Sequence, residues 1–200
     1  MQYLDPLFLI DTLGLVGVLG IIFAESGVFL GFFLPGDSLL FTAGLLATQN
    51  YFNIFTLIIL ASFAAILGDT FGYTFGNKIG PKIFTKQHSL VFSLKNLERS
   101  KLFFAKHGKK AVIMARFMPA VRTFTPILAG AGKMPYKSFL TYNIIGGVSW
   151  VIFMSGLGYF FGKLIPNPDR YILPVIVLII FISILPSLIE FIRNNRKKTP

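Results

Sequence analysis

The sequence predicts an all-α integral membrane protein with about four full transmembrane helices and two facing re-entrant helical hairpins in an inverted repeat. Three observations support this prediction. Of the 200 residues, 54% are hydrophobic and only 14% are charged, whereas soluble domains carry about 25% charged residues. Prolines interrupt two of the apolar stretches, and both stretches contain ionisable residues, which are costly at bilayer depth. Positive charge gathers in one internal segment and in the C-terminal tail.

Composition also limits the classes of function. The length allows a single membrane domain over residues 1–200 and no sizeable soluble domain. The chain has no cysteine, which excludes disulfides and thiolate metal sites, and its two histidines lie among basic residues. The net charge of +11 lies in loops and in the tail, where it sets membrane orientation. We therefore expect no metal, no other cofactor and no nucleic-acid partner.

The first half of the chain contains two predicted spans around a shorter interrupted segment. Residues 13–34 and 52–75 are long enough to cross a bilayer as helices. The segment between them, at about 35–48, begins with Pro35 and is too short to cross alone at about 1.5 Å per residue. We expect this segment to enter and leave the membrane on one side as a re-entrant hairpin.

The second half repeats this order after a basic segment at 78–110. Residues 111–130 are apolar but are interrupted by two prolines, and they predict a second re-entrant hairpin. Residues 139–161 and 171–192 are two further predicted spans, and a basic tail follows at 193–200.

The distribution of positive charge predicts the topology. Cytoplasmic loops carry an excess of lysine and arginine, so the basic segment and the C-terminal tail should both be cytoplasmic. Four full spans and two hairpins satisfy this condition, and the hairpins then approach from opposite faces. A weak internal repeat brings Asp37 opposite Arg122. It aligns Phe33-Leu34-Pro35 with Phe117-Met118-Pro119 and Ala43-Gly44 with Ala129-Gly130.

Five ionisable residues are expected at membrane depth, namely Glu25, Asp37, Asp69, Arg116 and Arg122. Buried charges persist when they are paired, so one interpretation is a static ion-pair network that stabilises the fold. The other is a polar cavity near the midplane, where the acids exchange protons and the arginines bind phosphate through their planar guanidinium groups. Acids that change protonation beside arginines that stay charged are the parts of a proton-coupled anion site.

A row of glycines predicts a helix face for close packing. Tyr73 belongs to a polar stripe one position further along the same helix. The row consists of Gly68, Gly72, Gly76 and Gly80.

Two prolines and two residues of a later span are further candidates. Pro35 and Pro119 break helices and free backbone N–H groups, which attract anions, although each proline is equally compatible with a simple kink. Asn143 and Trp150 are seven residues apart on one predicted helix and therefore share a face. We expect Asn143 to form hydrogen bonds inside the bundle, and Trp150 to pack or to anchor at an interface.

At these positions the sequence resembles the DedA family of bacterial inner-membrane proteins, relatives of the eukaryotic VTT-domain lipid scramblases. The resemblance covers nearly the whole chain. Ala120 and Asn77 depart from the family pattern, in which glycine and arginine are frequent. The matching motifs are Glu25 with Pro35-Gly36-Asp37, the stretch 68–76, Phe103-Phe104-Ala105-Lys106-His107-Gly108, Arg116-Phe117-Met118-Pro119-Ala120-Val121-Arg122-Thr123, Ala129-Gly130, Met134-Pro135-Tyr136, Asn143 and Trp150.

The resemblance implies two facing re-entrant hairpins in a multi-pass protein of the bacterial inner membrane. It also implies that Glu25, Asp37, Arg116 and Arg122 are needed for function. A further implication is a role in envelope homeostasis linked to the proton-motive force and, as in some members, in the recycling of undecaprenyl phosphate.

The leading hypothesis from the sequence is a proton-coupled flippase for a phosphate-bearing lipid, in which rocking of one repeat against the other gives alternating access. The expected partners are membrane phospholipids and a polyprenyl phosphate, with protons as the coupling ion. The sequence does not give the oligomeric state, and a homodimer is compatible with it. The residues assigned to the site are Glu25, Asp37 and Asp69 for proton exchange, Arg116 and Arg122 for the phosphate, and Pro35, Gly36, Tyr73, Pro119, Thr123 and Asn143 in support.

Three other functions stay open at this point. The first is a small-ion/proton antiporter that uses the same acids, with the arginines as structural counterions. The second is a lipid scramblase, and the third is a non-transporting membrane scaffold. An enzyme is not expected, because no nucleophile–base pair is evident in the sequence.

Overall fold

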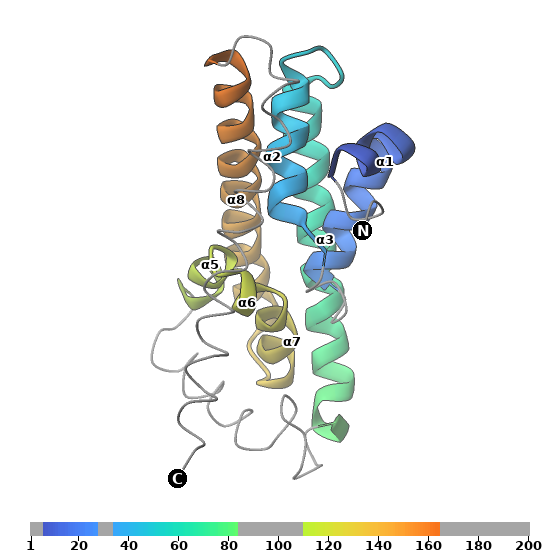
Figure 1. Ribbon diagram of the computed structural model, residues 1–200. Helices are drawn as coiled ribbons and strands as arrows, with labels where there is room; N and C mark the ends of the chain where they lie inside the picture. The colour runs from blue at the N-terminus through green and yellow to red at the C-terminus, as the bar shows by residue number, and fades with distance from the viewer. Residues whose placement is uncertain (1–5, 28–33, 84–109, 165–200) are drawn as a thin grey trace, which may run out of the picture.

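The computed structural model describes residues 6–27, 34–83 and 110–164, and this part of the chain is all-helical, as predicted, without a strand. Figure 1 shows two long helices with shorter helices packed along them. The predicted span at 171–192, the tail at 193–200 and most of the basic segment lie outside the described residues. The helices are α1 (Pro6–Gly27), α2 (Gly36–Ala47), α3 (Ile54–Ile83), α5 (Lys110–Arg116), α6 (Pro119–Arg122), α7 (Phe124–Ala131) and α8 (Tyr136–Leu164).

The long helices α3 and α8 lie side by side and run in opposite directions (Figure 1). Within the described residues they contain the two stretches, Ile54–Ile79 and Tyr136–Leu164, that are long and apolar enough to cross a membrane by length and composition. Both stretches coincide with spans predicted from the sequence.

One face of α3 carries a row of exposed apolar side chains at four-residue spacing. A second row on α3, made by Gly68, Gly72 and Gly76, lies against neighbouring helices, as the glycine spacing predicted. Apolar side chains facing outward and small residues facing inward are typical of a helix at the edge of a membrane bundle. The outward row consists of Phe55, Ile59, Phe63, Leu67, Phe71, Phe75 and Ile79, which are 36% to 72% exposed.

Helices α1 and α2 form an antiparallel pair. Gly36, at the start of α2, lies against the side chain of Glu25, near the end of α1. The apolar part of α1, Leu13–Gly27, and the whole of α2 are each shorter than the roughly 20 residues that a crossing needs. Residues 36–47 of the predicted re-entrant segment form one continuous helix, antiparallel to α1. The re-entrant arrangement itself stays a prediction.

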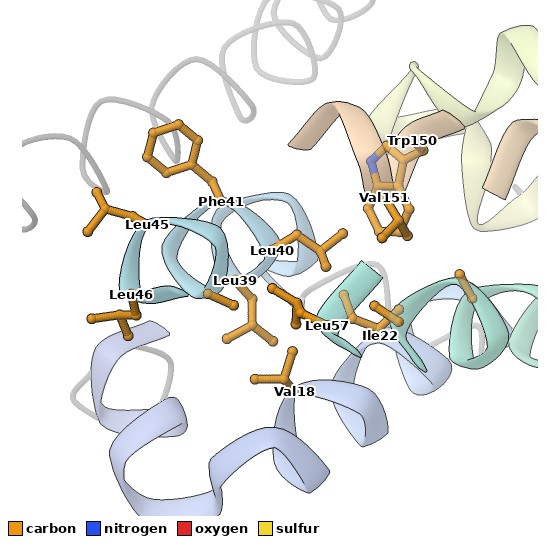
Figure 2. Packing of buried hydrophobic residues seen from close by; sticks show 13 residues of the cluster. Val18, Ile22, Leu39, Leu40, Phe41, Leu45, Leu46, Leu57, Trp150 and Val151 are labelled. Carbon is orange, nitrogen blue, oxygen red and sulfur yellow. The ribbon is translucent and has the colours of Figure 1, made fainter. Parts of the chain in front are cut away.

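The larger hydrophobic core surrounds α2. Apart from the partly exposed Asp37, every residue of this helix is buried, because α1, α3 and α8 enclose it (Figure 2). Short apolar helices gain little stability from local propensity, so tertiary packing of this kind is what holds α2 in place. The labelled core residues are Val18, Ile22, Leu39, Leu40, Phe41, Leu45, Leu46, Leu57, Trp150 and Val151.

The second hairpin is divided into three short helices. Pro119 stands at the first position of α6, and Pro126 stands in the first turn of α7, where a proline needs no hydrogen-bond donor. Helix α5 packs along α8, and α7 packs along α3. A smaller core joins these elements through Tyr73, Val112, Ala129 and Phe139.

Helix α2 crosses the long helix of the other half, α8, at two glycines. A Cβ added to Gly44 of α2 would overlap the backbone carbonyl of Ser155. A Cβ added to Gly158 of α8 would overlap the carbonyl of Phe41. Each helix thus provides a glycine and, three residues earlier, a carbonyl that contacts the partner's glycine.

Helix α7 crosses α3 in the same way. A Cβ on Gly130 of α7 would overlap the carbonyl of Tyr73, and a Cβ on Gly76 of α3 would overlap the carbonyl of Ile127. The three-residue spacing is the same on both helices as at the first crossing. The alignment of Gly44 with Gly130 inferred from the sequence agrees with this equivalence.

Candidate functional site

The C-terminal end of α1 and the first turn of α7 meet beside α3, at Gly72. Gly72 lies at the junction. A Cβ added there would be 3.3 Å from the carbonyl oxygen of Gly27, at the end of α1, and 3.3 Å from Cβ of Pro126, in α7. Gly72 belongs to the apolar stretch Ile54–Ile79, so the junction is remote from both ends of that stretch. The predicted site residues gather around it.

Arg122, the last residue of α6, binds both acids of the first hairpin. Its Nη1 donates a hydrogen bond to Oδ1 of Asp37 at 2.6 Å, and its Nη2 forms an ion pair with Oε1 of Glu25. The side chains of Arg122 and Glu25 are buried, and that of Asp37 is 14% exposed. The structure therefore brings together the two residues, Asp37 and Arg122, that the internal repeat placed opposite each other.

Arg116, the last residue of α5, is held by the two long helices. Its Nη2 forms an ion pair with Oδ2 of Asp69 in α3 and donates to Oδ1 of Asn143 in α8 at 2.8 Å. The amide of Asn143 in turn donates to the carbonyl of Ile66 at 3.2 Å. Asn143 is fully buried, and its contacts confirm the prediction that it forms hydrogen bonds inside the bundle.

Trp150 joins the two arginine centres, which the sequence analysis did not anticipate. Its ring lies 4.7 Å from Cζ of Arg122 and 5.8 Å from Cζ of Arg116, and both distances are typical of cation–π contacts. Its Nε1 also donates to Oδ1 of Asp37 at 2.8 Å. The available signal in the sequence was the shared helix face of Trp150 and Asn143.

The network contains more acids than bases. In the part of the chain that the structure describes, three carboxylates contact two guanidinium groups. Oε2 of Glu25 and Nε of Arg116 are buried, and neither atom has a hydrogen-bond partner among the described residues. A Cβ on Gly36 would overlap this carboxylate, so any larger residue there would displace the Glu25 side chain.

The supporting residues fall into two groups. Pro35 precedes the first turn of α2, which contains Asp37. Pro119 begins α6, and the buried Thr123 directly follows Arg122 at its end, so these three residues lie beside the network in the sequence. Tyr73 lies further along α3, outside the ion network, and its hydroxyl donates to the carbonyl of Met134. Among the described residues, no group of three or more His, Cys, Asp or Glu side chains could hold a metal ion.

Known protein families and sequences resemble this chain over most of its length. Residues 34–160 match the VTT domain. Protein DedA of Escherichia coli strain K12 is 46% identical over 178 residues, which cover 88% of this chain and 81% of that protein. An uncharacterized membrane protein of Mycobacterium leprae is 42% identical over 202 residues, covering 98% and 90%. The inner membrane protein YghB of E. coli K12 is 33% identical over 138 residues, covering 69% and 63%. No solved structure gives a significant match.

Proposed function

Because the chain belongs to the DedA family of VTT-domain proteins, we propose that it is a transporter, linked to the proton-motive force, that moves a phosphate-bearing lipid across the bacterial inner membrane. Undecaprenyl phosphate is the proposed substrate, and protons are the proposed coupling ion. The names of two relatives, a membrane protein and an inner membrane protein, support this location. The proposal involves no covalent chemistry.

In the proposed membrane arrangement, the α1–α2 and α5–α7 hairpins are both re-entrant. They enter from opposite faces and meet near the midplane. Helices α3 and α8 cross fully. With the span that the sequence predicts at 171–192, outside the described residues, this arrangement keeps the basic segment 78–110 and the C-terminal tail together in the cytoplasm. This version has one full span fewer than the sequence predicted, because α1 is an arm of the first hairpin.

The observation that carries the proposal is the guanidinium group of Arg122, buried and shared by two carboxylates. A guanidinium group binds carboxylate and phosphate with the same planar set of donors. Glu25 and Asp37 therefore occupy the donors that a phosphate headgroup needs. Protonation of these acids removes their charge and releases Arg122, so proton uptake favours headgroup binding. Proton uptake and lipid binding are coupled only if the headgroup binds the protonated and the ionised states with different affinities. Competition between the carboxylates and the phosphate for Arg122 supplies this difference.

The two glycine crossings suit the movement that the proposal requires. At each crossing the two helices meet backbone to backbone at their glycines. Rocking at both crossings opens the junction to one face of the membrane and closes it to the other. The apolar tail of the lipid stays in the bilayer throughout.

One observation favours a second candidate, a small-ion/proton antiporter. The excess of carboxylates and the unpartnered oxygen of Glu25 suit a small cation as well as a proton. In this alternative the arginines are structural counterions.

Transport in liposomes tests the proposal. Purified protein is reconstituted with a labelled polyprenyl phosphate, and transbilayer movement is measured with and without a pH gradient. We expect movement that depends on the gradient and is lost in Arg122→Ala. The matched control is Lys133→Ala, because Lys133 is exposed and binds Asn77, remote from the network.

The other outcomes separate the alternatives. Movement that ignores the gradient indicates a scramblase. Ion-stimulated proton flux without lipid movement indicates the antiporter. If folded, correctly inserted protein supports neither process, the scaffold interpretation replaces the proposed function.

A further inference from the structure

We propose that Trp150 is a positioning residue that holds Arg122 in place when Asp37 takes up a proton, and so keeps the guanidinium group available to an anionic headgroup. The inference rests on the proposed function and adds a residue to its mechanism. It gives the indole two separate roles, one for its edge and one for its face.

The edge of the indole contacts the acid. Nε1–H is a donor only, and it shares Oδ1 of Asp37 with Nη1 of Arg122, at 2.8 and 2.6 Å. Hydrogen bonds to an ionised carboxylate are about twice as strong as neutral ones, so both contacts weaken when Asp37 becomes neutral. The indole edge therefore stabilises the charged form of Asp37.

The face of the indole contacts the base. Cζ of Arg122 lies 4.7 Å from the ring centre, and this attraction does not depend on the charge of Asp37. Trp150 itself is 2% exposed and is fixed within the larger core, so it cannot follow a displaced side chain. When the carboxylates release Arg122, the ring still holds the guanidinium plane.

Other charged groups surround this pair and must be separated experimentally. Glu25 of α1 binds the second nitrogen of Arg122. Cζ of Arg116 in α5 lies 5.8 Å from the centre of the same ring, and Arg116 is paired with Asp69 of α3. A pH response at Trp150 therefore contains contributions from three acids, which single substitutions resolve.

The chain offers its own probe, because Trp150 is its single tryptophan. The purified full-length protein in lipid nanodiscs is titrated from neutral to acidic pH while the indole emission is recorded. We expect a sigmoidal change, most of which is lost in Asp37→Asn, because this acid accepts the hydrogen bond of the indole. In Asp69→Asn we expect most of the change to be retained, because Asp69 acts on the ring only through Arg116. An emission that stays flat over the titration overturns the inference.

Two substitutions separate the edge from the face. Trp150→Phe keeps an aromatic face and removes the N–H donor, whereas Trp150→Leu removes both. Binding of dodecyl phosphate is measured by calorimetry as a function of pH. We expect Trp150→Leu to weaken binding by roughly tenfold, in line with a desolvated cation–π contact. We expect Trp150→Phe to keep near-normal affinity at low pH and to move the midpoint of the pH dependence upward, since the charged form of Asp37 loses a donor.

The failure of this inference is distinguishable from that of the proposed function. If Trp150→Phe and Trp150→Leu lose only thermal stability, with unchanged pH midpoint and affinity, Trp150 is a packing residue and the transporter proposal is unaffected. If both binding effects appear but liposomes show no lipid movement, the positioning role is supported and the transporter proposal fails.

Discussion

The two hairpins make equivalent crossings with opposite chemistry. Helix α2 crosses α8 and α7 crosses α3 through the same arrangement of two glycines and two carbonyl groups. The first hairpin, however, supplies the acids Glu25 and Asp37, and the second supplies Arg116 and Arg122. The symmetric features position the hairpins, and the asymmetric residues form the site. The backbone of this fold therefore constrains where a ligand can bind but not which charge it carries.

The hairpins also differ in continuity. Helix α2 is unbroken over Gly36–Ala47, whereas prolines divide the second hairpin into three helices, the shortest being Pro119–Arg122. Arg122 is the last residue of the four-residue α6, whereas Asp37 lies in the first turn of α2, where a negative charge suits the helix dipole. The backbone of α2 thus stabilises the charge of Asp37, in addition to the ion pair with Arg122.

The largest expected effect concerns the two arginine centres. In the described part of the chain, Asp69 is the one carboxylate paired with Arg116, whereas Arg122 has two. Asp69→Asn leaves a buried guanidinium group without a carboxylate, and we expect a loss of about 3–5 kcal/mol in unfolding free energy. Glu25→Gln should cost clearly less, because Asp37 remains. Denaturant unfolding in detergent measures both, and equal losses would contradict this difference between the centres.

The next effect tests whether the crossings are equivalent. Gly44→Ala and Gly130→Ala each push a methyl group into a backbone carbonyl, and we expect similar losses of about 1–3 kcal/mol. Gly156→Ala is the matched control on α8, because an added Cβ there has nothing within 4 Å. Thermal unfolding of the three variants makes the comparison. A large loss at one crossing and none at the other would show that the two halves do not share this geometry.

A smaller effect is expected where the second hairpin is tied to α3. Tyr73→Phe removes the hydroxyl that donates to the carbonyl of Met134 and keeps the ring stacked 4.6 Å from Phe139. We expect a loss of about 0.5–1.5 kcal/mol in unfolding free energy. Lipid transport measured at full occupancy should be little changed, since Tyr73 lies outside the ion network. Loss of transport in a stable Tyr73→Phe protein would place this residue in the mechanism after all.

The smallest effect is expected at the outer end of the same hairpin. Lys133→Ala removes an exposed hydrogen bond from Nζ to Oδ1 of Asn77, 2.8 Å long. We expect a change within about 0.5 kcal/mol, as for most surface substitutions. The same unfolding assay measures it. If Lys133→Ala lowered the unfolding free energy as much as Gly130→Ala, this hydrogen bond, rather than the glycine crossing, would hold the second hairpin against α3.

The ion network could be predicted from the sequence because ionised side chains in apolar stretches have few ways to be satisfied. There are five such residues, with negative charges in the first half and positive charges in the second, so ion pairs between the halves were expected. Asp37 and Arg122 were placed opposite by the repeat and are in contact. The role of Trp150 could not be predicted in this way, because an indole packs equally well among apolar side chains. Its contacts also depend on the arrangement of four helices.

The packing of α1 shows a second limit of sequence reasoning. Residues 13–34 are apolar almost throughout, so hydropathy predicts the length of a helix there but not its neighbours. In the described part of the chain, the backbone carbonyls of Phe23 and Gly27 lie against Gly68 and Gly72 of α3. These contacts depend on tertiary packing, which the length of an apolar run does not reveal.

Both equivalent crossings lie between the two halves of the chain. One arm of each hairpin, α2 or α7, packs against the long helix of the opposite half, so neither half contains both helices of a crossing. A gene for half of this chain, whose product inserted into the membrane in either orientation, would provide both crossings by pairing two copies head to tail. In the single chain, the two halves keep the same backbone crossings although one carries the carboxylates and the other the guanidinium groups of the network.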